Sequence, residues 1–243
     1  VIGLSFDGTG LGTDGCIWGG EVLVAEPARF KRAAHLAYAP MPGGAAAIRE
    51  PWRMAISYLI GAYGDAHADI QLPALKKIGP GKLKVIGEMV RKGVNSPLTS
   101  SLGRLFDGVA ALTGIRDRVS FEGQAAMELE MLAVKGSYGS YRHKWEPGAG
   151  REIDPAPIIR GVVDDVLGGK DVAEISAKFH ATLIDLFSTV CLAVKKEYAL
   201  SRIVLSGGCF QNALLSERVQ TRLSRAGLNV YTHRQVPPGD GGI

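Results

Sequence analysis

The stretch 172–198 constrains the fold most, because it is long, helical in its hydrophobic period and apolar over most of its surface. A helix of this kind has to be buried, so other elements must cover it. An apolar run at 202–205 then predicts a buried strand, 211–226 an amphipathic helix, and 229–233 a further strand. Strands that alternate with long helices predict an α/β or α+β domain of two lobes.

The N-terminal half begins with strand patterns and continues with helical ones. Residues 1–6, 20–25 and 33–39 predict a three-stranded meander, with a turn-rich loop at 7–14. Helical periodicity then covers five further stretches, 51–61, 83–92, 102–112, 124–134 and 157–167. The stretch 135–154 is rich in Gly, Ser, Tyr and Pro, which predicts a long irregular insertion suited to covering a ligand.

Composition and charge exclude several classes of protein. With 46% hydrophobic and 21% charged residues, the chain has ordinary globular composition, which excludes intrinsic disorder. The 28 basic and 24 acidic residues leave a net charge of +4 without a dense basic stripe, so nucleic acid is not an expected partner. We find no signal peptide and no apolar run of about 18 residues, so a membrane is not expected either.

The three cysteines, Cys16, Cys191 and Cys209, lie far apart in the chain and form no CxxC pair. This spacing favours neither a disulfide framework nor a thiolate metal site. A reducing, cytoplasmic compartment is therefore the expected location of the protein.

Glycine is the outlier of the composition, with 32 of 243 residues against a usual share of about 7%. The excess forms short runs, and the first of them, at 7–10 (DGTG), follows a predicted strand. A carboxylate beside exposed backbone N–H groups suits a phosphate and its metal. Asp-Gly is also the commonest hairpin turn, so both interpretations stay open on the residues alone.

Two later glycine runs also follow predicted strands. The segment 206–212 (SGGCFQN) leads into an amphipathic helix, whose free N–H groups and dipole favour an anion. A tight connection with nothing bound is the alternative. Asn212 is expected one turn into that helix, facing the same space. The segment 238–242 (PGDGG) again places a lone carboxylate, Asp240, among glycines, and three such runs at strand ends predict one shared cleft.

Asp107 lies on the predicted helix 102–112, one residue after the core-facing Phe106. It could accept hydrogen bonds from sugar hydroxyls, but a solvated helix charge is the expectation from the residues alone. Glu122 and Gly123 stand at the start of the next predicted helix.

Seven motifs resemble, in order, the C-terminal, Kae1-like domain of the HypF family of [NiFe]-hydrogenase maturation carbamoyltransferases. They are FDGTG at 6–10, WGGE at 18–21, IREPWRMA at 48–55, SLGRLFD at 101–107, FEGQAAME at 121–128, SGGCFQN at 206–212 and PGDGG at 238–242. The resemblance implies a two-lobed, actin-like and sugar-kinase-like (ASKHA) ATPase fold, here N-terminally truncated, with lobes at about 1–100 and 101–243. ATP or carbamoyl-adenylate would then lie between the lobes.

The resemblance also implies a divalent metal, Fe, Zn or Mg, that bridges the acyl phosphate of the ligand. Asp7 and Asp240 match the family's carboxylate ligands to this metal and are the expected catalytic residues. The remaining two ligands in the family are histidines of an HHHAH-like motif, expected upstream of this sequence.

The nucleotide would be held by residues from several motifs. The 7–10 segment matches the family's phosphate-contacting loop, two residues match positions at the ribose, and three match the nucleotide loop of the second lobe. The residues of the phosphate-contacting loop are Asp7, Gly8, Thr9 and Gly10. Those at the ribose are Asp107 and Gly123, and those of the second-lobe nucleotide loop are Gly207, Gly208 and Asn212.

The implied reaction is carbamoyl transfer from carbamoyl-adenylate to the C-terminal cysteine of a HypE-type maturation partner, for synthesis of the cyanide ligand. Carbamoyl phosphate and ATP would be handled by further domains of the parent protein. Because the partner supplies the thiolate, none of this chain's cysteines is needed. Two alternatives stay open: a related enzyme, such as one that transfers threonylcarbamoyl to tRNA or carbamoyl to a hydroxyl, and a non-catalytic docking module.

Overall fold

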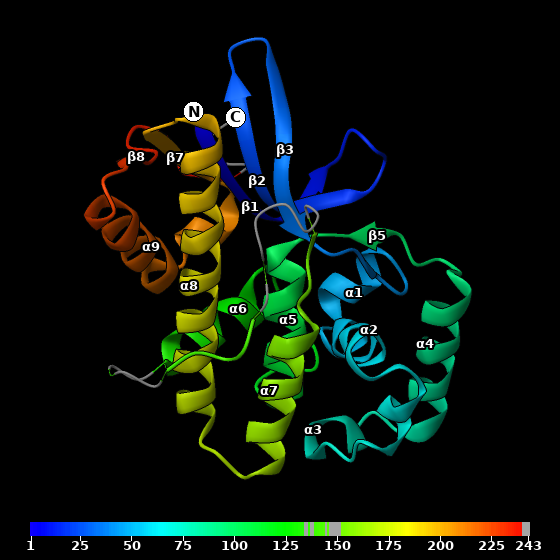
Figure 1. Ribbon diagram of the computed structural model, residues 1–243. Helices are drawn as coiled ribbons and strands as arrows, with labels where there is room; N and C mark the ends of the chain where they lie inside the picture. Colours follow the sequence, from blue (N-terminus) through cyan, green and yellow to red (C-terminus); the bar gives the residue numbers. More distant parts are fainter. Residues whose placement is uncertain (134–135, 137–138, 144, 146–151, 240–243) are drawn as a thin grey trace.

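The computed structural model describes residues 1–133, 136, 139–143, 145 and 152–239, and within them the strands form one eight-stranded sheet (Figure 1). The order β4-β5-β2-β1-β7-β8 forms the main path, and β3 joins β2 to β6. The strands are β1 (Ile2–Leu11), β2 (Ile17–Glu26), β3 (Arg29–Leu36), β4 (Ala39–Pro40), β5 (Leu98–Thr99), β6 (Glu152–Ile153), β7 (Arg202–Ser206) and β8 (Asn229–Tyr231).

β1 lies at the centre of this sheet, antiparallel to β2 and parallel to β7. Its residues Ile2, Leu4 and Phe6 alternate along the strand and are fully buried, as expected where one face of a strand meets the core. Because β2 also pairs antiparallel with β3, the predicted three-stranded meander is confirmed.

β1 is longer than the sequence predicts, because it continues through the first glycine run to Leu11. Its register with β2 is irregular between Phe6 and Gly10, as at a β-bulge. The turn comes later, where the Gly12 N–H donates to the Cys16 carbonyl at 2.9 Å. The predicted loop at 7–14 is therefore wrong in its first half, and Asp7-Gly8 is not the hairpin turn.

Seven of the helices in the described residues correspond to predicted periodicities, whereas α1 and α3 were not predicted. The helices are α1 (Ala45–Arg49), α2 (Trp52–Tyr63), α3 (Pro73–Lys76), α4 (Pro80–Lys92), α5 (Leu102–Leu112), α6 (Gln124–Leu132), α7 (Ala156–Leu167), α8 (Val172–Tyr198) and α9 (Ala213–Arg225), with 3-10 turns η1 (Gly64–Asp69) and η2 (Gly208–Gln211). The predicted strand 33–39 is divided between β3 and β4. Of the predicted insertion 135–154, most lies outside the described residues.

α8 forms the long core helix that the sequence predicts, and Figure 1 shows it between α9 and α7. Its Phe187 ring lies 4.4 Å from that of Phe6 on β1, and its Phe179 ring lies 5.1 Å from that of Phe106 on α5. By length and composition α8 could cross a membrane, but 67% of its most apolar window is buried inside the protein. These contacts fix β1 and α5, two of the elements that carry the candidate site.

Candidate functional site

A cleft of about 490 Å³ lies where β1, α5, α6 and η2 meet, a volume in the usual range for small-ligand sites. Seven of the predicted ligand-binding residues line it: Asp7, Gly8, Thr9, Asp107, Gly123, Gly208 and Asn212. The structure thus brings together residues that are up to about two hundred positions apart in the chain. Asp240, the other predicted metal ligand, lies outside the described residues.

Two predicted glycines do not line this cleft. Gly10 pairs with Trp18 in the β1–β2 ladder. Gly207 has a φ of +103°, and a Cβ on it would lie 2.1 Å from the carbonyl oxygen of Phe6. Its N–H donates to the Pro238 carbonyl at 2.9 Å, so Gly207 serves the close approach of backbones beside the cleft.

Asp7 stands where the β1–β2 ladder is interrupted. Its Oδ1 accepts a hydrogen bond from the Gly8 N–H at 2.7 Å, and its carbonyl accepts one from Ser101 Oγ, at the N-terminus of α5, at 2.6 Å. A Cβ on Gly208 would lie 3.2 Å from Asp7 Oδ1. The Asp7 backbone is therefore anchored to the N-terminus of α5, and its carboxylate lies beside η2.

Glu21, in the WGGE motif, supports the arrangement of β1 and α5 around Asp7. It is buried, and its Oε2 accepts hydrogen bonds from the N–H groups of Gly19 and Gly20 at 2.6 and 2.7 Å. Its Oε1 accepts from Ser100 Oγ at 2.5 Å and from Arg32 Nη2 at 2.8 Å. Glu21 thereby ties β2 and β3 to the segment that leads into α5.

Asp107 is buried, so the expectation of a solvated helix charge is wrong. It is only 3% exposed, because α5 is covered along its whole length. Its Oδ2 lies 3.1 Å from Nη2 of Arg104, which is itself 2% exposed. Burial raises the pKa of Asp107 to about 6, while the Arg104 charge acts in the opposite direction.

Sequence reasoning missed Arg104, which also lines the cleft. Its spacing of three residues from Asp107 on one helix was the available signal, since such residues are neighbours. Within the described part of the chain, Arg104 Nε and Nη1 and Asp107 Oδ2 are buried without a hydrogen-bond partner. Each such group costs roughly 1–3 kcal/mol and calls for a ligand or water to satisfy it.

Asn212 is the N-cap of α9 rather than a residue one turn into the helix. Its Oδ1 accepts a hydrogen bond from the Leu215 N–H at 2.8 Å, which is the preferred use of Asn at this position. Its Nδ2 donates to His180 Nε2 at 2.9 Å, while His180 Nδ1 donates to the Ser176 carbonyl at 2.8 Å. Burial lowers the pKa of His180 to about 4, so the ring is neutral and can accept at Nε2.

Cys209 also lines the cleft, and burial raises the pKa of its thiol well above the usual range, with Asp7 adding to the shift. Such a thiol is a poor nucleophile at neutral pH. Among the described residues, no group of three or more His, Cys, Asp or Glu side chains could hold a metal ion.

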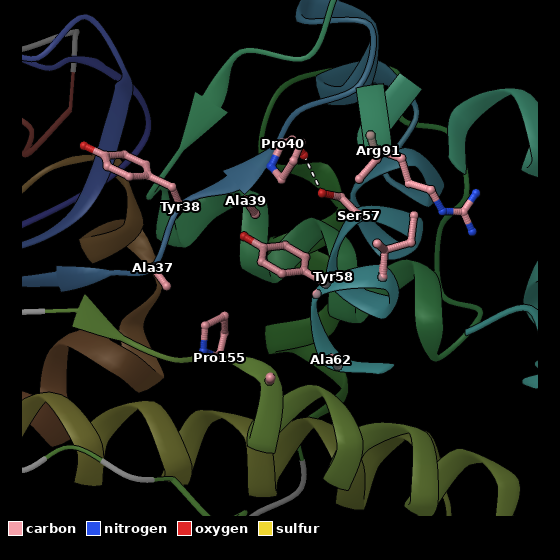
Figure 2. Close-up of a pocket in the computed structure, with 13 residues that line it drawn as sticks. Ala37, Tyr38, Ala39, Pro40, Ser57, Tyr58, Ala62, Arg91 and Pro155 are labelled. Carbon is pink, nitrogen blue, oxygen red and sulfur yellow. Dashed lines mark hydrogen bonds between the residues drawn. The ribbon is translucent and has the colours of Figure 1, made fainter. Parts of the chain in front are cut away.

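A second cavity of about 290 Å³ lies between β4, α2 and the start of α7 (Figure 2). Its walls are mainly apolar, and Ser57 Oγ at one edge donates to the Pro40 carbonyl at 2.5 Å. None of the predicted site residues lines it. The cleft beside β1 is therefore the candidate functional site.

A family model for the second subdomain of the Kae1-like domain of carbamoyltransferases matches residues 3–243. Carbamoyltransferase HypF2 of Cupriavidus necator is 35% identical over 270 aligned residues, and carbamoyltransferase HypF of Rhodobacter capsulatus is 37% identical over 239. These alignments cover 100% and 98% of this chain but only 32% and 30% of the relatives.

The fold comparison agrees with the sequence comparison. A crystal structure of full-length HypF in the phosphate- and nucleotide-bound form matches with a TM-score of 0.93 and 39% identity. The match covers 100% of this chain and 31% of that one. The chain thus spans about a third of the length of these three proteins.

Proposed function

The chain belongs to the HypF family of carbamoyltransferases, within their Kae1-like domain, and from this premise we propose that its cleft binds an adenine nucleotide during carbamoyl transfer in hydrogenase maturation. The observation that carries the proposal is the convergence of five segments of the chain on one cleft. Those segments are 7–9, 103–107, 122–131, 208–212 and Gly239. The related HypF structure with bound phosphate and nucleotide supports the choice of ligand.

The proposed fold is the actin-like and sugar-kinase-like ATPase fold, of which the matching family model describes the second subdomain. The predicted lobes at about 1–100 and 101–243 do not form separate sheets, because in the described part of the chain β1 pairs with β7 within one sheet. The cleft draws residues from both of these ranges. ATP or carbamoyl-adenylate would lie along it. The Asp107 carboxylate would accept hydrogen bonds from ribose hydroxyls, and the backbone around Gly8 and Gly208 would approach the phosphates closely.

In the proposed reaction, the C-terminal cysteine thiolate of a HypE-type partner attacks the carbonyl carbon of carbamoyl-adenylate. A C–S bond forms, the bond from that carbon to the phosphate oxygen breaks, and AMP leaves with the electron pair. Because burial keeps the Cys209 thiol protonated, this chain's own cysteine does not compete for the carbamoyl group. Exclusion of water by the closed cleft would limit hydrolysis.

A divalent metal held by Asp7 and Asp240 stays a prediction. The described residues contribute one of the two predicted carboxylates, and they do not by themselves form a metal site. We therefore assign no step to a metal. We also propose a cytoplasmic location, on the ground that Cys16, Cys191 and Cys209 are free thiols, as a reducing compartment keeps them.

The test combines nucleotide binding with transfer of carbamoyl to the partner's cysteine, followed by mass spectrometry. Asn212→Ala should weaken nucleotide binding and transfer, whereas Asn229→Ala, at an exposed position on β8, should change neither. Partner binding without any transfer would favour the docking module. Modification of tRNA in place of the partner would favour the threonylcarbamoyl alternative, and absence of nucleotide binding would refute the proposal.

A further inference from the structure

The charges around the cleft are unevenly distributed. Its described lining carries four carboxylates, on Asp7, Asp107, Glu122 and Glu130, but a single cationic side chain, Arg104. A phosphate entering such surroundings meets repulsion from most sides. The one attractive side chain in this described lining is therefore a strong candidate for contact with the anionic part of a ligand.

Arg104 is also poorly satisfied by the protein itself. A guanidinium has five N–H donors, yet with the described residues the Arg104 side chain makes only the 3.1 Å ion-pair contact from Nη2 to Asp107 Oδ2. Its Nε and Nη1 are buried without a partner among residues that the structure describes. Arginine is seldom buried this deeply unless it is paired, so the spare donors indicate a group that is bound during function.

The position of the guanidinium matches the proposed phosphate end of the cleft. Its Nη2 would lie 3.3 Å from a Cβ on Gly8, and a Cβ on Gly103 would lie 2.8 Å from the Gly8 Cα. The N-terminus of α5 therefore packs directly against the bulged part of β1. The positive end of the α5 dipole adds to the Arg104 charge there.

We propose that Arg104 binds the phosphoryl group of the nucleotide through charge-assisted hydrogen bonds. The inference rests on the proposed nucleotide binding and adds to it the residue that distinguishes a nucleotide from a nucleoside. A planar guanidinium offers paired donors that fit two oxygens of a phosphate. The same hydrogen bonds would hold free inorganic phosphate, so the experiment has to distinguish binding of phosphate from binding of the nucleotide.

The experiment compares the dissociation constants of AMP, adenosine and inorganic phosphate by calorimetry at fixed ionic strength. Wild type should bind AMP more tightly than adenosine. In Arg104→Met this preference for AMP over adenosine should fall by roughly 10- to 100-fold, and Arg104→Lys should retain part of it. Phosphate that binds alone and is lost in Arg104→Met would extend the assignment to free phosphate.

Because Arg104→Met leaves a buried Asp107 without its cation, that variant could lose stability. The comparison is therefore repeated in Asp107→Asn and in the double variant Arg104→Met/Asp107→Asn, where the pair is neutral. The AMP preference should persist in Asp107→Asn and disappear in the double variant.

Two results would overturn the inference, and they differ in what else they refute. An AMP preference that stays unchanged in Arg104→Met, whether or not both ligands bind more weakly, would refute the role of Arg104 alone. Failure of wild type to bind AMP, adenosine and phosphate would refute the proposed nucleotide site together with it.

Discussion

Asp107→Asn is expected to make the stability of the protein less dependent on pH. In the folded state burial raises the pKa of Asp107 from 3.8 to about 6, so the folded protein holds this proton more tightly than the unfolded chain does. Stability therefore falls as the pH rises through this interval and stays reduced above it. The two-unit difference, at about 1.36 kcal/mol per unit, corresponds to roughly 3 kcal/mol.

Urea unfolding at a series of pH values from about 4 to about 8 measures this effect, because other titrating groups cancel between wild type and variant. Over this range we expect the stability of Asp107→Asn relative to wild type to rise by roughly 2.5 kcal/mol, because the unfolded carboxyl is already partly ionised at pH 4. Asp164→Asn, on the exposed side of α7, is the matched control and should parallel wild type. A difference between wild type and Asp107→Asn that stays constant with pH would refute the reasoning.

Three further substitutions test how the cleft is supported. Gly207→Ala should lower the thermal midpoint of unfolding, because the new Cβ would lie 2.1 Å from a β1 carbonyl oxygen. Gly61→Ala is the control: its Cβ would enter open space on α2, so it should stabilise the protein by up to about 1 kcal/mol. Glu21→Ala should cost roughly 3–5 kcal/mol in urea unfolding, since it removes one partner of a buried ion pair. His180→Phe should weaken AMP binding in wild type but not in Asn212→Ala, and additive losses in this double-mutant cycle would contradict a positioning role.

The elements that the sequence predicts best are those with a long internal period. α8 has the predicted bounds, and α5 begins and ends where the apolar face of 102–112 does. β5 and β6 have two residues each, and α3 has four. Such short elements contain no full period, so only their tertiary partners define them.

The length of β1 shows a different limit of prediction from sequence. Asp7 to Gly10 have the composition of a turn, and local propensity favours a loop there. They are held in the strand by pairing with β2 at both ends of the irregular stretch, where Phe6 pairs with Gly20, fourteen residues away along the chain, and Gly10 pairs with Trp18, eight residues away. Pairing between strands overrides local preference at this point, and it is what directs the Asp7 carboxylate towards η2.

The predicted site shows a third limit of prediction from sequence. The motifs identify the residues of the site, but they do not show which of them are buried. Asp107 has the spacing of a helix-surface charge, and only the packing of α2, α6, α7 and β1 around α5 removes it from water. That packing encloses an ion pair whose donors and acceptor are not satisfied by the described residues. A fold selected for stability alone would replace such a pair with apolar side chains. Its retention at the wall of a cleft is therefore best explained by a ligand that completes its hydrogen bonds, and the difference in pH dependence between wild type and Asp107→Asn measures how much stability the buried Asp107 charge costs.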